Sequence, residues 1–190
     1  MFTLFLRAII LYAFLILTMR LLAEERQKRT DQLLLTSPVS VGGIVLGKYL
    51  AAVTVMLLTV LLTFAFVGIV AIYGKVYPGE IFVGYLGFIL EGCAFLALDL
   101  FLSGCAGKQV TAAVTAFGAN FALWIMDLLV DAVNVSWISD ALDFFSLYGR
   151  NEPFLMGQLS FASVGYDVSF AIAFIVLTIH GLDARRYRGA

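Results

Sequence analysis

Charged residues are scarce in this chain of 190 residues, and their scarcity excludes an ordinary soluble domain. Asp, Glu, Lys and Arg make up 13% of the sequence, hydrophobic residues make up 62%, and the mean hydropathy is +1.00. A water-soluble fold could not bury that much apolar surface. The net charge of -1 gives no indication of a nucleic-acid partner. The composition therefore predicts an integral membrane protein in contact with the lipid bilayer.

Histidine and cysteine are nearly absent, which leaves little material for metal or catalytic chemistry. The chain has one histidine, His180, and two cysteines, Cys93 and Cys105. On one helix these cysteines would lie roughly 18 Å apart at 1.5 Å per residue, too far for a disulfide. The sequence contains no Ser/His/Asp set and no H-E-x-x-H motif. We therefore expect no enzymatic activity, no metal and no cofactor in this chain, and we expect His180 to be an interfacial or packing residue.

Long apolar runs are abundant instead. A helix needs about 20 residues to cross a hydrocarbon core of roughly 30 Å, and runs of this length occur at five places separated by Gly, Pro or charge. We expect an all-α polytopic membrane protein, a single transmembrane domain over residues 1–190. The expected spans lie near residues 2–22, 44–72, 81–102, 110–130 and 164–182.

The distribution of Lys and Arg predicts the orientation, because basic loops next to spans stay on the cytoplasmic side. One set of span ends carries Arg26, Lys28, Arg29, Lys48, Lys108, Arg185, Arg186 and Arg188, and the other only Lys75 and Arg150. The C-terminus is therefore predicted to be cytoplasmic, in the inner or plasma membrane.

With five spans Met1 would lie outside, yet the first run lacks the basic start and the cleavage site of a signal peptide. We expect either that the beginning of the chain is missing or that a partner supplies the preceding helix; a first helix with its N-terminus outside is the alternative.

A charged island at residues 24–48 interrupts the apolar sequence. Residues 21–35 contain no Gly or Pro and are rich in helix-forming residues, so the first span is predicted to continue into the cytosol as one helix. The residue before Pro38 disfavours the α conformation, which ends that helix, and Ser40 can cap the next one, which would reach about 45 Å. Leu33, Leu34 and Leu35 are then exposed among charges, the pattern of an interaction surface.

One motif in the island is misleading. Residues Gly42 to Lys48 read G-x-x-x-x-G-K, the start of a P-loop. Tyr49 follows where Ser or Thr would bind magnesium, no strand precedes the motif, and the residues lead directly into an apolar helix. Gly43 and Gly47 form instead a G-x-x-x-G pattern, which would let another helix approach closely.

The strings EER, Thr30, LLLTSPVS and IVLGK resemble the intracellular coupling segment of ABC-2 type transporter permeases, in particular the gliding-motility-like export permeases. The later spans are similar in order and length, so the resemblance covers essentially the whole chain. Such permeases begin with an interfacial elbow helix and one further span, which this sequence lacks. They often have an acidic residue where this chain has Gln32, so the salt bridge of that acid to a partner is not expected here.

The resemblance implies a permease subunit of an ABC exporter. It would work as a homo- or heterodimer, with ATP and Mg bound by a separate ABC ATPase subunit. Residues 24–43, the coupling segment, would dock into a groove of that subunit through Thr30, Gln32, Leu33, Leu34, Thr36, Ser37, Pro38 and Val39. Three alternatives are a haem-exporter-like permease, a membrane scaffold that recruits a cytosolic partner without transport, and a juxtamembrane loop that binds anionic lipid. The nearly balanced charges of the segment do not favour the last of these.

Four ionisable residues fall inside the expected spans, where charges are costly and usually face the protein interior. We hypothesise that Arg7 and Glu91 pair with each other or line the translocation path. Asp99 and Asp127 lie nearer the span ends, so we expect snorkelling or water to satisfy them.

The stretch from residue 131 to residue 163 is too polar to span the membrane. Aromatic and small residues recur there at helical spacing, which predicts an interfacial helix through Trp137, Ala141, Phe144, Phe145 and Tyr148. After Pro153, residues 154–161 could form a second one. By the resemblance these would be external helices that cap the outer mouth of an exporter; alternatively, they only anchor the last span.

Overall fold

The computed structural model describes residues 23, 40–73, 77–132 and 146–188, and every regular element in these ranges is a helix. Four helices are long: α3 (Val41–Tyr73), α4 (Pro78–Cys105), α5 (Gln109–Ala132) and α9 (Phe161–Arg188). Two are single turns: α7 (Leu147–Arg150) and α8 (Glu152–Leu155). Each long helix contains a stretch long and apolar enough to cross a membrane. The predicted all-α polytopic fold is confirmed with four of its spans, and the fifth, at residues 2–22, lies outside the described residues.

Local sequence signals set several helix boundaries. The backbone N–H of Gly43 donates to Ser40 Oγ at 3.2 Å, so Ser40 caps α3 as predicted. Pro78 occupies the first turn of α4, where its missing N–H costs nothing. The backbone N–H of Lys108 donates to Thr111 Oγ1 at 3.2 Å at the start of α5.

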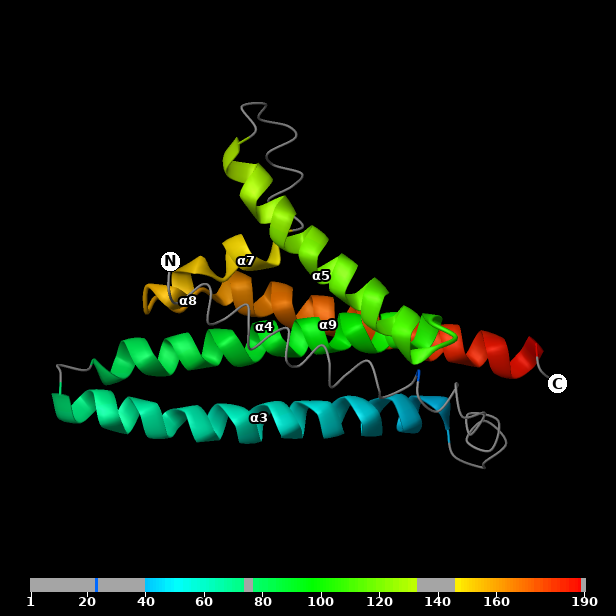
Figure 1. Cartoon of the computed structure of the whole chain (residues 1–190), viewed down its shortest axis with the longest axis horizontal. Helices are drawn as coiled ribbons and strands as arrows, with labels where there is room; N and C mark the ends of the chain where they lie inside the picture. Colours follow the sequence, from blue (N-terminus) through cyan, green and yellow to red (C-terminus); the bar gives the residue numbers. More distant parts are fainter. Residues whose placement is uncertain (1–22, 24–39, 74–76, 133–145, 189–190) are drawn as a thin grey trace.

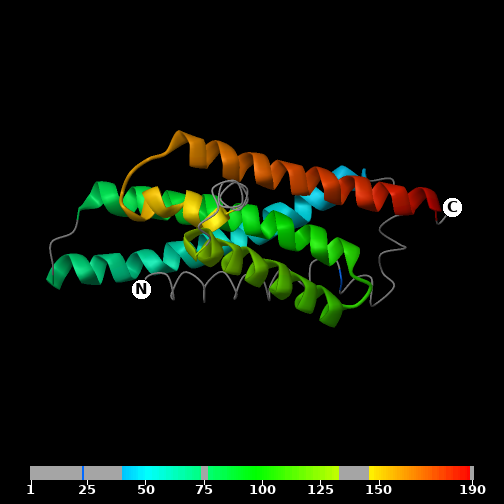
Figure 2. The ribbon, with the colours of Figure 1, turned by 90° about the horizontal axis from the view of Figure 1, so that it is seen from above.

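Helix α4 lies at the centre of the bundle. Figures 1 and 2 show α3, α5 and α9 arranged around it, with α9 parallel to α4 and α3 and α5 antiparallel to it. The start of α3, the end of α4, the start of α5 and the end of α9 therefore lie at one end of the bundle, which we call the coupling end (Figure 1, right). The opposite end, where α7 and α8 lie, we call the cap end. Towards the cap end α5 diverges from the other long helices (Figure 1).

The core follows from the position of α4. Residues of α4 between Glu91 and Leu100 are almost all buried, whereas α3 buries one stripe at helical spacing: Val41, Val45, Ala52, Met56 and Val60. Gly92 gives Met56 room, because a Cβ at Gly92 would lie 2.5 Å from Met56 Sδ. The outward face of α3 is apolar and exposed, with Leu62 72% exposed. Such a helix is suited to contact with lipid.

The cap end corrects one sequence prediction. A helix over residues 154–161 was expected, but α8 ends at Leu155 and Gly157 adopts a φ of 72°, which turns the chain before α9 begins at Phe161. The side chain of Phe154 is only 1% exposed, because it packs on α4 at Gly87 instead of lying at an interface. Of the residues named for the other predicted interfacial helix, only Tyr148 is among the described residues, and it lies in α7.

Candidate functional site

The predicted docking residues, from Thr30 to Val39, lie outside the described residues, as does Arg7. The structure does describe both neighbours of residues 24–39, namely Ala23 and Ser40. These two residues show where the coupling segment joins the bundle.

The entry into the segment is attached to α4. Ala23 is fully buried, and its backbone N–H donates to Ser103 Oγ at 3.1 Å, a contact between residues 80 positions apart in the chain. Ser103 is 1% exposed and lies in the last turn of α4. The chain that leads into the coupling segment is therefore fixed at the coupling end.

The exit from the segment is fixed at the same end by apolar packing. Val41 and Val45 in the first turns of α3 form a buried cluster with Leu100 of α4. Partly buried side chains pack around this cluster: Tyr49, Ile175, Ile179 and Leu182. Helix α3 thus packs at its start against both α4 and α9, and the described residues on the two sides of residues 24–39 contact the same central helix.

Further contacts join α3 to α4 along its length. The hydroxyl of Tyr49 donates to the carbonyl oxygen of Cys93 at 3.1 Å. Nearer the cap end, the hydroxyls of Thr63 and Tyr85 are hydrogen-bonded at 3.1 Å, and the rings of Phe64 and Tyr85 are 4.5 Å apart. A force on the start of α3 would therefore reach α4 at several levels.

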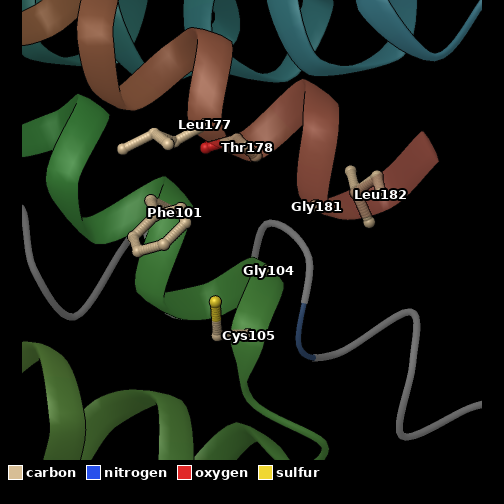
Figure 3. A pocket seen from close by; sticks show the side chains of 7 residues that line it. All are labelled: Phe101, Gly104, Cys105, Leu177, Thr178, Gly181 and Leu182. Carbon is tan, nitrogen blue, oxygen red and sulfur yellow. The ribbon is translucent and has the colours of Figure 1, made fainter. Parts of the chain in front are cut away.

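A small cavity lies between α4 and α9 at the coupling end. Its volume is about 20 Å³, and its lining residues are Phe101, Gly104, Cys105, Leu177, Thr178, Gly181 and Leu182 (Figure 3). That volume holds about one water molecule. The cavity is too small to receive a cargo, so it is a packing defect between two helices.

Glu91 is 0% exposed and follows Gly87 by one turn on the same face of α4. A buried acidic residue is what the sequence predicted at this position. Its predicted pairing with Arg7 stays a prediction, because Arg7 is outside the described residues.

The prediction for Asp99 was wrong. Asp99 is 2% exposed, and its Oδ1 accepts a hydrogen bond from Asn120 Nδ2 of α5 at 2.8 Å, so neither snorkelling nor bulk water satisfies it. Asp127 is half-buried, and its Oδ1 accepts from Ser146 Oγ at 2.7 Å. Each acid is thus bonded to a residue of another element that no local pattern points to.

Asp167 was missed by the sequence reasoning. It is 1% exposed in α9, and its Oδ1 lies 3.4 Å from Nδ2 of the buried Asn151, which also donates to the carbonyl oxygen of Leu147 at 3.1 Å. An acidic residue a few positions inside an apolar run is the signal that could have found it. Asn151 connects α9 to the short helices of the cap end.

The glycine motifs of the island are helical. Gly42 to Lys48 lie in the first turns of α3, whereas a P-loop links a strand to a helix. Gly47 is exposed, and no atom lies within 4 Å of a Cβ built there, so within the described residues this glycine receives no other helix. The described residues contain no cluster of three His, Cys, Asp or Glu side chains suited to a metal ion. Within the described residues neither Cys93 nor Cys105 forms a disulfide, and His180 is exposed on α9.

Comparison with known proteins identifies the family. The family model described as ABC-2 family transporter protein matches residues 2–179. No curated protein and no solved structure matches the chain. Because the match covers nearly the whole sequence, the chain belongs to the ABC-2 transporter family and is a membrane permease subunit of an ABC transporter.

Proposed function

We propose that this ABC-2 family permease couples ATP hydrolysis in a separate ATPase subunit to the export of a substrate, with the coupling segment as the point of contact. Thr30, Gln32, Leu33, Leu34, Thr36, Ser37, Pro38 and Val39 would dock into a groove of that subunit. ATP and Mg would bind to the partner, and this chain would perform no chemistry on them.

One observation carries the proposal: the described residues on the two sides of residues 24–39 contact the same central helix at the same end. Ala23 is hydrogen-bonded to Ser103, and Val41 packs against α4 with Leu100. A segment attached at both sides to one rigid helix can move that helix when a partner pulls on it. Transmission between sites requires such packed elements with two discrete arrangements.

The packing supports a path for the motion. Helix α3 is joined to α4 at Tyr49 and at Thr63, and α4 packs along α9 more extensively than along any other described element. A pull on the coupling segment would therefore tilt α3, α4 and α9 together. The path between permease halves would open on the side where these helices separate from their neighbours.

Dimerisation, orientation and location complete the proposal. Two permeases, identical or different, would assemble with two ATPase subunits in the inner or plasma membrane. The coupling end and the C-terminus would face the cytoplasm, where the ATPase is. Lys48 and Lys108 both belong to that end of the bundle, which agrees with the orientation that basic residues favour. Arg7 and Glu91 would pair within the membrane.

ATPase turnover is the first test. The permease is reconstituted in lipid nanodiscs with an ABC ATPase encoded beside it, and turnover is measured for Leu34→Asp and Pro38→Ala. We expect at least a tenfold fall for Leu34→Asp, because a carboxylate replaces an apolar contact, and a smaller fall for Pro38→Ala. Leu62→Ala, a change at a residue 72% exposed on α3, is the matched control and should leave turnover unchanged.

The outcome separates two functions. A changed turnover supports a transport subunit. Recruitment of the ATPase with the same turnover in both docking variants would contradict the coupling role and favour a membrane scaffold. Failure of the two proteins to associate in any form would contradict both.

A further inference from the structure

Helix α5 is attached to the bundle differently from the other long helices. Helices α3 and α9 pack against α4 and against each other, whereas among the described elements α5 packs substantially only against α4 and the single turn α7. Figure 1 shows the consequence: α5 starts beside α4 at the coupling end and leads away from α4 and α9 towards its far end.

The first half of α5 is held by close apolar packing. Ala112 and Ala116 are 0% and 1% exposed, and they precede Asn120, which bonds to α4, by two turns and one turn on the same helix face. Alanines let two helices approach closely, which is the usual way that membrane helices are held together. This half of α5 is therefore a firm base.

The second half is held on the same face by two polar contacts. Asn120 Nδ2 donates to Asp99 Oδ1 of α4 at 2.8 Å, and Ser146 Oγ, just before α7, donates to Asp127 Oδ1 at 2.7 Å. Positions 120 and 127 are two helical turns apart, about 10 Å along the axis. Between them Leu123 is partly buried against Phe95 and Leu147.

The contact with Asp99 leaves Asn120 incompletely satisfied. Asn120 is 6% exposed, and within the described residues nothing donates a hydrogen bond to its Oδ1, although a carboxamide oxygen can accept two hydrogen bonds. A buried acceptor without a donor is unfavourable, and part of that cost would be relieved if the amide moved to water or to a headgroup. The closed position of α5 is therefore less favourable than a complete acid–amide pair would make it.

The contact with Asp127 has little space around it. The backbone N–H of Gly149 donates to Ser146 Oγ at 3.0 Å, and a Cβ at Gly149 would lie 2.9 Å from Ser146 Oγ and 3.0 Å from Asp127 Oδ1. Glycine at this position keeps the serine hydroxyl free to reach α5. This second contact joins α5 to the cap end, which is itself bonded to α9 through Asn151 and Asp167.

We propose that the second half of α5 is an arm that swings away from α9, and that the Asn120–Asp99 and Ser146–Asp127 hydrogen bonds are two latches that hold it closed. Hydrogen bonds between membrane helices are weak, so the loss of one latch should raise the open-to-closed ratio about threefold and the loss of both about eightfold. A motor can readily overcome latches of this strength. The use of the arm in export rests on the proposed function, but the arm itself does not.

The position of the arm can be measured without an ATPase. Spin labels are attached through Leu129→Cys on α5 and Val168→Cys on α9, at side chains that are 43% and 42% exposed, in a chain that also carries Cys93→Ala and Cys105→Ser. The labelled permease in nanodiscs is diluted with unlabelled cysteine-free permease, so that pulsed electron paramagnetic resonance reports distances within one chain.

Five variants are compared on this background. Ser146→Ala and Asn120→Leu should each raise the ratio of the long-distance to the short-distance population about threefold. The double variant should raise this ratio about eightfold. Asp99→Asn should not, because two carboxamides can form two hydrogen bonds with each other and would satisfy Asn120 Oδ1. Thr115→Ala removes an α5 hydroxyl that bonds only within its own helix and should leave the distances unchanged.

Unchanged distances in the double variant would overturn the proposal, as would the same shift in Asp99→Asn as in Asn120→Leu. If Asn120→Leu fails to fold, as judged by gel filtration, Ser146→Ala alone decides: a shift of about threefold supports the latch, and no shift overturns it. Because no ATPase is present, these outcomes are independent of the test of coupling.

Discussion

The two ends of the bundle are held together by different kinds of contact. At the coupling end, Val41, Val45 and Leu100 interlock as a small apolar cluster, and the hydrogen bond from Ala23 to Ser103 adds to it. At the cap end, α7 and α8 attach to three long helices through glycine notches and side-chain hydrogen bonds. We expect the interlocked apolar side chains to stay in contact when α3 is pulled. Single hydrogen bonds, in contrast, can be broken and formed again. The proposed arm would therefore break only the polar contacts of α5, while Phe154 keeps α8 packed on α4.

The largest expected effect tests the cap end at Phe154. Phe154→Ala removes a ring that is 1% exposed, so we expect the free energy of unfolding to fall by about 3–5 kcal/mol. The measurement is chemical unfolding in detergent micelles followed by circular dichroism. Phe161→Ala, at a side chain 81% exposed, is the control and should change it little. Equal effects of the two substitutions would show that the cap is not packed as described.

The notch that receives this ring gives the next largest effect. A Cβ at Gly87 would lie 2.5 Å from Phe154 Cβ, so Gly87→Ala should destabilise the protein by about 1–3 kcal/mol through overpacking. At Gly118 no atom lies within 4 Å of such a Cβ, so Gly118→Ala should be neutral or stabilising in the same unfolding measurement. If Gly87→Ala were also neutral, the ring would not be seated against α4.

The hydrogen bond at the entry of the coupling segment is expected to contribute about 1 kcal/mol. Ser103→Ala leaves the buried N–H of Ala23 without its acceptor, and it should reduce stability by that amount and lower ATPase turnover in the coupled system. Ser169→Ala is matched to it, because that hydroxyl is exposed and bonds to Gly165 within its own helix at 2.6 Å. A loss of stability with full turnover would remove Ser103 from the coupling path.

The smallest effect belongs to the contact between α3 and α4 near the cap end. Tyr85→Phe removes the hydroxyl that is hydrogen-bonded to Thr63 at 3.1 Å but keeps the ring that packs on Phe64. The expected loss is about 0.6 kcal/mol, the average for a polar contact between membrane helices. Tyr85→Ala, which removes both contacts, should cost clearly more in the same assay; if it does not, the ring contributes nothing to the pairing of α3 with α4.

Most helix positions could be predicted from short stretches of the sequence. Apolar runs separated by Gly and Pro predict four spans within a few residues of α3, α4, α5 and α9, and Ser40 caps α3 as the sequence predicts. These features depend only on residues close together in the chain. The membrane adds a strong constraint, because an apolar run of that length has few other ways to satisfy its backbone.

The contacts between helices could not be predicted in the same way. Asn120 meets Asp99, and Gly87 receives Phe154, only because of how the helices pack, and no alternation or spacing in the sequence encodes that register. The error for residues 154–161 has the same origin: nothing in the sequence near Pro153 shows that Phe154 packs on Gly87 or that Gly157 turns the chain. The docking residues of the coupling segment remain a prediction from resemblance.

The central claim is that the coupling segment is gripped by a cytoplasmic ATPase, and photo-crosslinking tests it most directly. A photoreactive amino acid is placed at Leu34 or at Pro38, with the exposed Leu62 of α3 as the control position, in cells that also produce the ABC ATPase under test. The account predicts that both segment positions form an adduct with the ATPase. It also predicts that neither position forms an adduct with lipid or is labelled by a reagent confined to the cell exterior. Adducts with lipid alone, or labelling of position 34 by a reagent confined to the cell exterior, would contradict it.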